Sequence, residues 1–453
     1  MIRYGQLLTK RHILLSPNRL LLSNISTRHQ HATPHKETEA EKRDHRVVGK
    51  SQDLFMIHHW SPGAVFMLPH GTRIFRKLQE YIRKQYADFG FDEVMTPLIY
   101  KKDLWEASGH WQNYRDDMFT VSYDQESKDD VFGLKPMNCP GHCLIFDNQP
   151  KSYRDLPVRL ADFGALHRNE HSGALSGLTR VRQFHQDDAH IFCTESQVFQ
   201  EISSTLAFVD RVYNAFKFPR YDFVLSTRSS GSKYIGEISE WERAEESLKQ
   251  ALDACGQSWT VRPGDAAFYG PKIDILVKDA HDRTHQTATI QLDFQLPRRF
   301  GLTYQDSDGN SQVPVIVHRA ILGSFERMMA ILMEHTAGRW PFWLNPRQAI
   351  VIPIGETARE YAETVMKQLA SRDGRASHKQ DMLFIDVDKS TGKTLNKMIR
   401  EAQVAQYNYI LVVGEKEKEH KTVNVRRRDG KNLGNMPIEE ILHLFEDLEL
   451  NYE

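Results

Sequence analysis

The segment FHQDDAHIFC places two carboxylates, an imidazole and a thiol inside an otherwise apolar run. If the segment is a β-strand, its side chains alternate between two faces. Asp188 and His190 then share one face with Gln186, whereas Asp187 and Cys193 point to the other. A neutral imidazole can bind zinc, and a carboxylate on the same face can accept hydrogen bonds from whatever the metal holds. The alternative is a hydrogen-bonded core histidine, which this segment alone favours.

Two of the four cysteines, Cys139 and Cys143, have CxxxC spacing within KPMNCPGHC, but no second such pair occurs. A structural zinc site with four local ligands is therefore not expected. A catalytic zinc needs only three protein ligands, which can come from distant positions. The two prolines and the glycine around Cys139 predict a turn. Four cysteines are too few for a disulfide framework, which favours a reducing compartment.

The segment ALHRNEHSGALSGLTRVRQF surrounds a loop rich in Gly and Ser with three arginines: Arg168, Arg180 and Arg182. Guanidinium groups bind phosphate bidentately, so a hairpin of this kind could hold a nucleotide. A solvated hairpin is the alternative. Arg327 lies in an apolar helical segment and must be paired or hold an anion. The helical pattern is equally compatible with an ion pair to Glu326 or Glu334. No P-loop, GxGxxG, GxSxG or HExxH pattern occurs.

These residues must be positioned by a central group of predicted antiparallel strands, FPRYDFVLSTR, AFYGPKIDILVKD and TATIQLDFQLP. VPVIVHR, residues 313–319, predicts a further strand, and the next segment, AILGSFERMMAILMEH, predicts a helix. Residues 68–90 predict an amphipathic helix that ends at Gly90. FDEVMTPLIY predicts a strand interrupted by Pro97, which suits an edge or interface position.

The pattern changes after residue 345. Strands and helices then alternate, which predicts a compact α/β domain with a largely parallel sheet. KEKEHKTVNVRRRDGK, residues 416–431, is a dense basic cluster for which a solvated edge is the alternative. HKETEAEKRDHRVVGKSQD, residues 35–53, is polar and predicts a linker.

The chain of 453 residues contains 40% hydrophobic and 26% charged residues, which fits an ordinary globular protein of about two to four domains. No apolar run reaches the roughly 18 residues that span a bilayer. Residues 1–36 carry six Lys and Arg residues but no Asp or Glu, which is typical of a mitochondrial transit peptide; a disordered basic tail is the alternative. Without those six of the 59 basic residues, 53 remain against 60 acidic residues, a net charge of −7. Nucleic-acid contacts must then use local patches.

These segments, in this order, resemble a class II aminoacyl-tRNA synthetase, and closely a threonyl-tRNA synthetase. The family's first motif resembles EVMTPLIY, in which Pro97 would lie at a dimer interface. Its second motif resembles HRNE together with the following loop and VRQFHQDD. Its third motif resembles HRAILGSFER. The resemblance implies a mixed α/β and α+β fold. An antiparallel-sheet catalytic core over residues 48–345 is expected between a targeting or disordered segment at 1–47 and an α/β anticodon-binding domain at 346–453.

Members of this family hold a catalytic zinc ion that binds the amino and hydroxyl groups of threonine. The resemblance puts its ligands at Cys139, His190 and His318, with one zinc per subunit. Such a set leaves a coordination position for substrate. Such a site would reject valine, which lacks the hydroxyl group that zinc binds. An amino acid that lacks a required polar group is rejected more strongly than one that lacks a methylene group. Asp188 matches the residue that receives the threonine hydroxyl. The rest of the threonine pocket matches Met137, Gln186, Tyr269 and Gln291.

The ATP site that the resemblance implies comprises Arg168, Glu170, Arg180, Phe184, Gln286 and Arg327. Arg168 matches the arginine on the α-phosphate and Arg327 the one on the γ-phosphate, which makes these two the expected catalytic residues. Phe184 matches the ring under the adenine. Gln286 and Gln291 are five positions apart and would face opposite sides of a regular strand. A bulge or an early strand end is expected if both line one pocket.

Catalysis is then expected mainly from positioning and charge stabilisation. The threonine carboxylate attacks the α-phosphorus of ATP, and arginines with Mg²⁺ neutralise the developing charge. The threonyl group passes to the 3′-terminal ribose of tRNA(Thr), so no protein nucleophile is required. Glu417 and Arg426 match anticodon contacts of the family. A homodimer in the mitochondrial matrix, without membrane contact, is expected.

Only about 50 residues precede the expected core, so a separate editing domain is expected to be missing. Zinc cannot reject serine, and one methyl group is worth only about 1–3 kcal/mol, so appreciable serine activation is expected. A non-catalytic nucleic-acid-binding relative is one alternative, which the intact Arg168, Arg327 and zinc set disfavour. A synthetase for proline or serine is another, and the zinc set disfavours proline. No role is assigned to Asp187.

Overall fold

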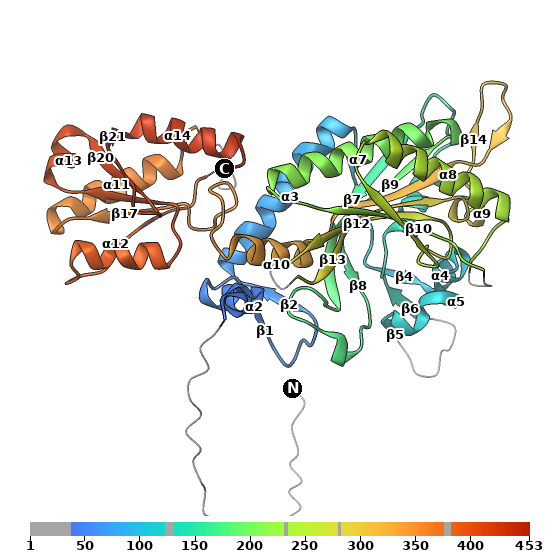
Figure 1. The fold of residues 1–453 in the computed structure, drawn as a ribbon, viewed down its shortest axis with the longest axis horizontal. Coiled ribbons are helices and arrows are strands. Elements are labelled where there is room, and N and C mark those ends of the chain that lie inside the picture. The colour runs from blue at the N-terminus through green and yellow to red at the C-terminus, as the bar shows by residue number, and fades with distance from the viewer. Residues whose placement is uncertain (1–37, 123–130, 231–233, 280–281, 376–381) are drawn as a thin grey trace, which may run out of the picture. The chain divides into compact units, whose positions relative to one another are not determined.

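The computed structural model describes residues 38–122, 131–230, 234–279, 282–375 and 382–453. The targeting segment expected within residues 1–36 lies outside the described residues. Figure 1 shows a large sheet with flanking helices, followed in the chain by a smaller α/β unit coloured orange to red. The expected fold class, an antiparallel-sheet core followed by an α/β domain, is confirmed. No helix in the described ranges is both long and apolar enough to cross a membrane.

The large sheet contains nine strands among the described residues, and its central strands run antiparallel. In spatial order they are β11 (Trp259–Pro263), β10 (Asp222–Thr227), β12 (Lys272–Lys278), β13 (Thr284–Asp293), β16 (Val315–Ser324), β9 (Gln183–Cys193), β7 (Val158–Asp162) and β3 (Asp92–Glu93), with β8 (Ala165–His167) beside β9. All the strands predicted for the central region are present, and the strand at residues 313–319 extends further, to Ser324.

Opposite faces of the large sheet pack against different helices. One face forms the main core with α3 (Pro69–Phe89), α7 (Val198–Ala215), α8 (Ile238–Ala254) and α10 (Phe325–Thr336). The other face packs on α6 (Cys139–Asp147). Ile191 and Cys193 of β9 belong to the first core and Phe192 to the second. The two-residue alternation predicted for this segment is therefore confirmed.

Smaller elements complete this part of the chain. They are α1 (Glu39–Arg43), α2 (His45–Ser51), the hairpin β1 (Phe55–Ile57) and β2 (Val65–Met67), β4 (Ile99–Lys101), α4 (Lys102–Ser108), α5 (His110–Tyr114), β5 (Thr120–Ser122), β6 (Val131–Leu134), α9 (Leu296–Arg299), β14 (Tyr304–Gln305) and β15 (Ser311–Gln312). Pro97 separates edge strand β3 from β4, as the position of this proline predicted.

In the part of the smaller unit that the structure describes, five strands form one sheet. Their order is β18 (Ile385–Val387), β17 (Ala349–Pro353), β19 (Tyr409–Val413), β20 (Thr422–Arg427) and β21 (Asn432–Pro437). Its helices are α11 (Arg359–Ala370), α12 (Leu395–Val404), α13 (Glu415–His420) and α14 (Ile438–Leu450). The prediction of a largely parallel sheet is wrong in part. The β18, β17 and β19 strands are parallel, but β20 and β21 join as an antiparallel hairpin.

Three local predictions are wrong. The segment expected to be a linker forms α1 and α2, and His45 and Val48 of α2 are buried. The helix expected after residue 319 starts only at Phe325, because the apolar residues before it continue β16. The turn expected around Cys139 is the start of α6, whose first turn tolerates a proline.

Candidate active site

Strand pairing places two of the expected zinc ligands directly opposite each other. His190 of β9 is the register partner of His318 of β16, and the two rings meet at 4.6 Å between centroids. Cys139 is the first residue of α6, which packs on this face of the sheet. One potential ligand atom from each of the three residues lies within 4.8 Å of the other two, and all three residues are buried.

The surroundings of these three residues fit a zinc ion. His318 Nε2 lies 3.0 Å from a carboxylate oxygen of Asp293, and His190 Nδ1 lies 2.7 Å from Nδ1 of His142. Such contacts orient metal-bound imidazoles and leave the second nitrogen of each ring for the metal. Burial lowers the pKa of His190 well below its usual value and raises that of the Cys139 thiol. One sulfur and two neutral imidazoles are a donor set that zinc prefers.

Two further buried residues in this region were not identified from the sequence. His110 Nε2 lies 3.8 Å from Cys139 Sγ and 3.2 Å from the Met137 sulfur, and burial lowers its pKa to about 3. Asn138 donates a 3.0 Å hydrogen bond to Asp188, whose pKa burial raises to about 6. His110 lies 29 positions before Cys139 in a polar helix, so local patterning could not connect the two.

The expected threonine pocket adjoins the three metal-binding candidates. Tyr269 stacks on His318 with 5.2 Å between ring centroids and hydrogen-bonds Gln291 through its hydroxyl. Gln291 is in turn the register partner of His318. Gln186 and Gln291 both line the cleft that contains the arginines described below. The structure thus brings together Gln186, Asp188 and His190 of β9, Gln291 of β13 and His318 of β16, with Cys139 at the start of α6 and Tyr269 packed against them.

One cleft gathers every residue expected to bind ATP. It is lined by the six residues Arg168, Glu170, Arg180, Phe184, Gln286 and Arg327, among others. The Arg168 guanidinium lies 5.1 Å from the centroid of the Phe184 ring, and Arg180 forms a 2.9 Å ion pair with Glu170. A flat aromatic ring beside several cations is suited to an adenine and its phosphates.

Arg327 does not form the helical ion pair that was the alternative interpretation. Its guanidinium donates to the backbone carbonyls of Thr179, at 3.0 Å, and Gln286, at 3.1 Å. Burial and the charges of Arg168 and Arg180 all lower its pKa. Three guanidinium groups that repel one another in a partly buried cleft are stabilised by a polyanion. The two glutamates considered as its partners contact histidines instead: Glu326 contacts His185 and Glu334 contacts His45.

The bulge expected between Gln286 and Gln291 is confirmed. In β13, Ala288 pairs with Ile275 and Gln286 pairs with Leu276, so Thr287 is the extra residue. The bulge changes the alternation by one position, and both glutamines line the same cleft.

Asp187, to which the sequence assigned no role, joins β9 to the irregular end of β16. Its carboxylate accepts the backbone N–H groups of Ile321 at 2.8 Å and Leu322 at 2.9 Å. The fully buried Arg319 lies 3.4 Å from it and donates to its backbone carbonyl at 2.7 Å. Regular pairing of β9 with β16 stops between Ala320 and Ser324. The carboxylate therefore satisfies backbone groups that this irregularity releases.

The two residues expected to contact the anticodon are linked by a chain of hydrogen bonds in the smaller unit. Arg426 Nε donates to Asn424, Asn424 donates to Asn435, and Asn435 donates to Glu417, over 3.1, 2.9 and 3.4 Å. None of the four side chains is fully buried. α13, β20 and β21 thus present one connected set of donors and acceptors.

Each of the two units resembles a domain of known proteins. Residues 119–336 match the tRNA synthetase class II core domain (G, H, P, S and T), and residues 348–448 match the anticodon binding domain. Threonine–tRNA ligase 1, cytoplasmic, of Mus musculus is 53% identical over 414 residues. Threonine–tRNA ligase, mitochondrial 1, of Arabidopsis thaliana is 53% identical over 408 residues. These alignments cover 91% and 90% of this chain but 55% of each relative, so the chain spans about half of their length.

Solved structures agree as well. The RNA binding domain of threonyl-tRNA synthetase from Cryptosporidium parvum Iowa II superimposes with a TM-score of 0.83 and is 47% identical. That match covers 89% of this chain and 98% of the other. Prolyl-tRNA synthetase from Giardia lamblia shares the fold, with a TM-score of 0.66 and 16% identity. That match covers 90% of this chain and 80% of the other. The chain belongs to the threonyl-tRNA synthetase family of class II aminoacyl-tRNA synthetases.

Proposed function

We propose that this chain activates threonine with ATP and transfers it to tRNA(Thr). The observation that carries the proposal is the shared position of two sites. The cleft with Arg168, Arg180 and Arg327 is floored by residues of β9, β13 and β16. Two of the three metal-binding candidates, His190 and His318, stand on β9 and β16, and Cys139 of α6 lies against them. A polyanion and a small chelating substrate would therefore meet on one surface, as an adenylation reaction requires.

The residues Cys139, His190 and His318 would hold a zinc ion, supported by the contacts to Asp293 and His142. When bound, zinc supplies a Lewis acid that can coordinate an amino group and a hydroxyl group together. Asp188, on the same face of β9 as His190 and held by Asn138, would accept the hydrogen bond of the threonine hydroxyl. Tyr269, which stacks on His318, and its hydrogen-bond partner Gln291 would line the rest of the threonine pocket.

The arginine cleft would orient ATP for attack at the α-phosphorus. Phe184 would stack under the adenine, while Arg168 binds the α-phosphate and Arg327 the γ-phosphate. These guanidinium groups, with Mg²⁺ accompanying ATP, would neutralise charge that develops as the threonine carboxylate attacks and pyrophosphate leaves. The cation cluster is preorganised, because Arg327 is already fixed by two carbonyl groups. The chain needs no nucleophile of its own for this step.

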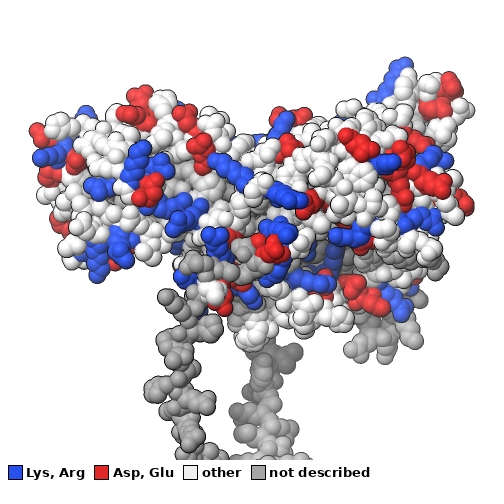
Figure 2. All heavy atoms as spheres, viewed as in Figure 1, with Lys and Arg blue, Asp and Glu red and all other residues white. Residues whose placement is uncertain are grey.

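The smaller unit would bind the tRNA anticodon through the connected set that includes Glu417 and Arg426. Figure 2 shows Lys and Arg intermixed with Asp and Glu over the visible face. On this face, affinity for RNA would then come from local contacts.

We also propose that the chain serves translation in the mitochondrial matrix and works as a homodimer. The first proposal rests on the acid-free, basic composition of residues 1–36. The Arabidopsis relative is named mitochondrial, whereas the mouse relative is named cytoplasmic. The second rests on the likeness of EVMTPLIY to the first class motif and on exposed apolar side chains there, such as Met95.

The decisive measurement is ATP–pyrophosphate exchange with each amino acid in turn. Wild type should show strong exchange with threonine, weaker but measurable exchange with serine, and none with valine or proline. Serine keeps both chelating groups and lacks only a methyl group worth about 1–3 kcal/mol, whereas valine lacks the hydroxyl. Exchange with proline but not threonine would contradict the proposed substrate.

Cys139→Ala should abolish threonine exchange and the binding of stoichiometric zinc, measured by elemental analysis. Cys143→Ala is the matched control, because both thiols are buried in α6 one helical turn apart but only Cys139 belongs to the three-ligand cluster. Robust threonine activity in Cys139→Ala, or equal losses in both variants, would contradict the assignment of the metal site.

A further inference from the structure

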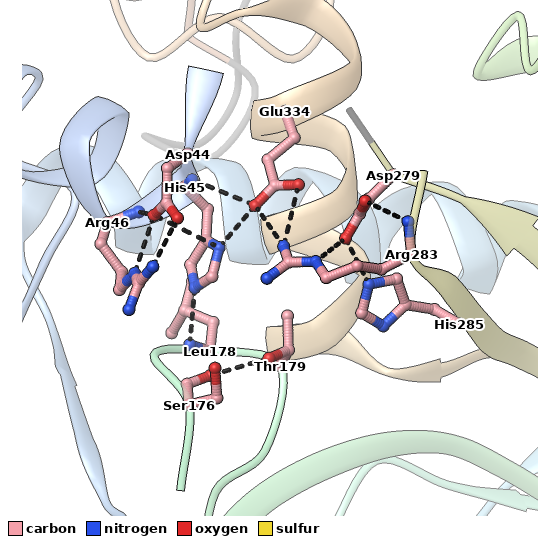
Figure 3. Close-up of polar contacts among 10 residues, drawn as sticks. All are labelled: Asp44, His45, Arg46, Ser176, Leu178, Thr179, Asp279, Arg283, His285 and Glu334. Atoms are coloured by element: carbon pink, nitrogen blue, oxygen red, sulfur yellow. Dashed lines mark hydrogen bonds and ion pairs between the residues drawn. The ribbon is translucent and has the colours of Figure 1, made fainter. Parts of the chain in front are cut away.

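His45 connects the start of α2 to two elements of the candidate active site. Its Nδ1 lies 2.7 Å from a carboxylate oxygen of Glu334 in α10, and its backbone N–H donates to the same oxygen at 3.2 Å. Its Nε2 accepts the backbone N–H of Leu178 at 3.2 Å. Figure 3 shows the His45 ring between Glu334 and the loop that carries Leu178. His45 and Leu178 are fully buried.

This group is a hydrogen-bonded cluster rather than a metal site, although Asp44, His45 and Glu334 have metal-binding atoms within 4.8 Å of one another. Arg46 donates to both carboxylate oxygens of Asp44, at 2.8 and 2.6 Å. Arg283 contacts Glu334 at 3.3 Å. Two guanidinium cations already compensate these carboxylates. Because Nε2 of His45 accepts a backbone hydrogen bond, Nδ1 carries the proton and donates to Glu334.

The loop held by His45 is the tight turn that precedes Arg180. Within the turn, the backbone N–H of Arg180 bonds the Ser176 carbonyl at 3.3 Å, and the Thr179 hydroxyl donates to the same carbonyl at 2.8 Å. Gly177 adopts φ +49°, and a Cβ there would lie 2.1 Å from His45 Nε2. The imidazole therefore packs directly on the turn, where only glycine fits.

Both supports of this turn are anchored on one helix. Arg327 of α10 donates to the Thr179 carbonyl, and Glu334 of the same helix holds His45, which in turn holds Leu178. Arg327 and Glu334 are about two helical turns apart and so share a face of α10. α10 thus fixes two neighbouring backbone groups of the turn. It holds the Thr179 carbonyl directly through Arg327, and the Leu178 N–H indirectly through His45 of α2.

We propose that His45 is a positioning residue for nucleotide binding. It holds the Ser176–Arg180 turn so that Arg180 and the Thr179 carbonyl, which orients Arg327, keep the positions they need for the triphosphate. The inference rests on the proposed function in that it takes ATP as the ligand of this cleft. His45 itself touches no substrate, since it lies beneath the turn and packs against its backbone. The role belongs to a segment, α2, that lies outside the three motifs quoted above.

Two substitutions separate the two bonds of the imidazole. His45→Asn places an amide near the position of Nδ1, so it keeps a donor for Glu334 but no longer reaches Leu178. His45→Gln reaches the position of Nε2 and offers the Leu178 N–H an acceptor. Loss of one buried hydrogen bond predicts about a three- to tenfold rise in the KM for ATP in His45→Asn. The KM for threonine should stay at the wild-type value, and His45→Gln should restore most of the ATP affinity.

Hydrogen exchange of the peptide containing Leu178 supplies a readout that does not depend on activity. The Leu178 amide should exchange faster in His45→Asn than in wild type without ATP, and His45→Gln should be intermediate or protected. An unchanged KM for ATP, equal effects of both substitutions, or wild-type exchange of Leu178 in His45→Asn would overturn the inference. Absence of threonine-dependent exchange in wild type would instead contradict the proposed function.

Discussion

At the residue scale, two adjacent aspartates on one strand perform separate tasks because their side chains leave opposite faces of β9. Asp187 faces the core and satisfies two backbone amides and Arg319. Asp188 faces the pocket and is held by Asn138. Strand alternation predicted this separation from the sequence alone. The partners of Asp187 could not be predicted, because they lie more than 130 positions away in an irregular part of β16.

The Asp187→Asn and Asp188→Asn pair tests this separation. Asp187→Asn should lower the free energy of unfolding by about 1–3 kcal/mol, because an amide has one oxygen and leaves one of the buried N–H groups of Ile321 and Leu322 without an acceptor. Asp188→Asn should change stability little, but should raise the KM for threonine about tenfold or more through a lost charged acceptor. Urea unfolding and threonine-dependent exchange measure the two effects. A large loss of stability in Asp188→Asn with normal threonine affinity would reverse the assignment.

At the scale of elements, the strongly periodic helices and strands were predictable, whereas their irregular junctions were not. The amphipathic pattern of α3 and the strand patterns of β10, β12 and β13 were clear in the sequence. The extension of β16 to Ser324 was not, because a short apolar run fits a strand or a helix equally well. The α2 helix was missed because its buried residues stand in a polar segment and gain their burial from α10.

The junction of β16 with α10 gives the prediction at this scale. Gly323 adopts φ +65°, and a Cβ there would lie 2.4 Å from the carbonyl oxygen of Thr287, the bulged residue of β13. Gly323→Ala should therefore displace the bulge and the adjacent Gln286 carbonyl, which orients Arg327. We expect a higher KM for ATP, an unchanged KM for threonine and a stability loss of about 1–3 kcal/mol.

Gly309→Ala is the control for backbone strain alone, because Gly309 has φ +81° but a Cβ added there would meet no described atom within 4 Å. It should lower stability without changing either KM. Similar KM values for ATP in both variants would show that the contact with Thr287 does not position the nucleotide cleft.

At the scale of the whole molecule, chain length predicted about two to four domains, and the resemblance implied a catalytic core followed by an anticodon-binding domain. Residues 119–336 and 348–448 match one family model of each kind. Distances between segments were not predictable, because the cleft and the pocket combine residues spread from Cys139 to Arg327.

The segment around Pro97 exposes several apolar side chains. Met95 is 92% exposed, Leu98 46% and Ile99 39%, all beside Pro97. Adjacent apolar side chains left in water indicate an interaction surface.

The proposed occupant of this surface is a second copy of the chain. Sedimentation velocity of the wild type should give a molecular mass twice the 52.6 kDa of one chain. The Met95→Asp variant should give the mass of a single chain. Burying a large apolar side chain contributes about 1.5–3 kcal/mol, and the substitution replaces that contribution with the cost of desolvating a carboxylate at each copy. Val404→Asp, at an equally apolar position that is 71% exposed at the end of α12, should remain a dimer. A wild-type chain that sediments as a monomer would contradict the proposed homodimer, and dissociation by both substitutions would place the contact elsewhere.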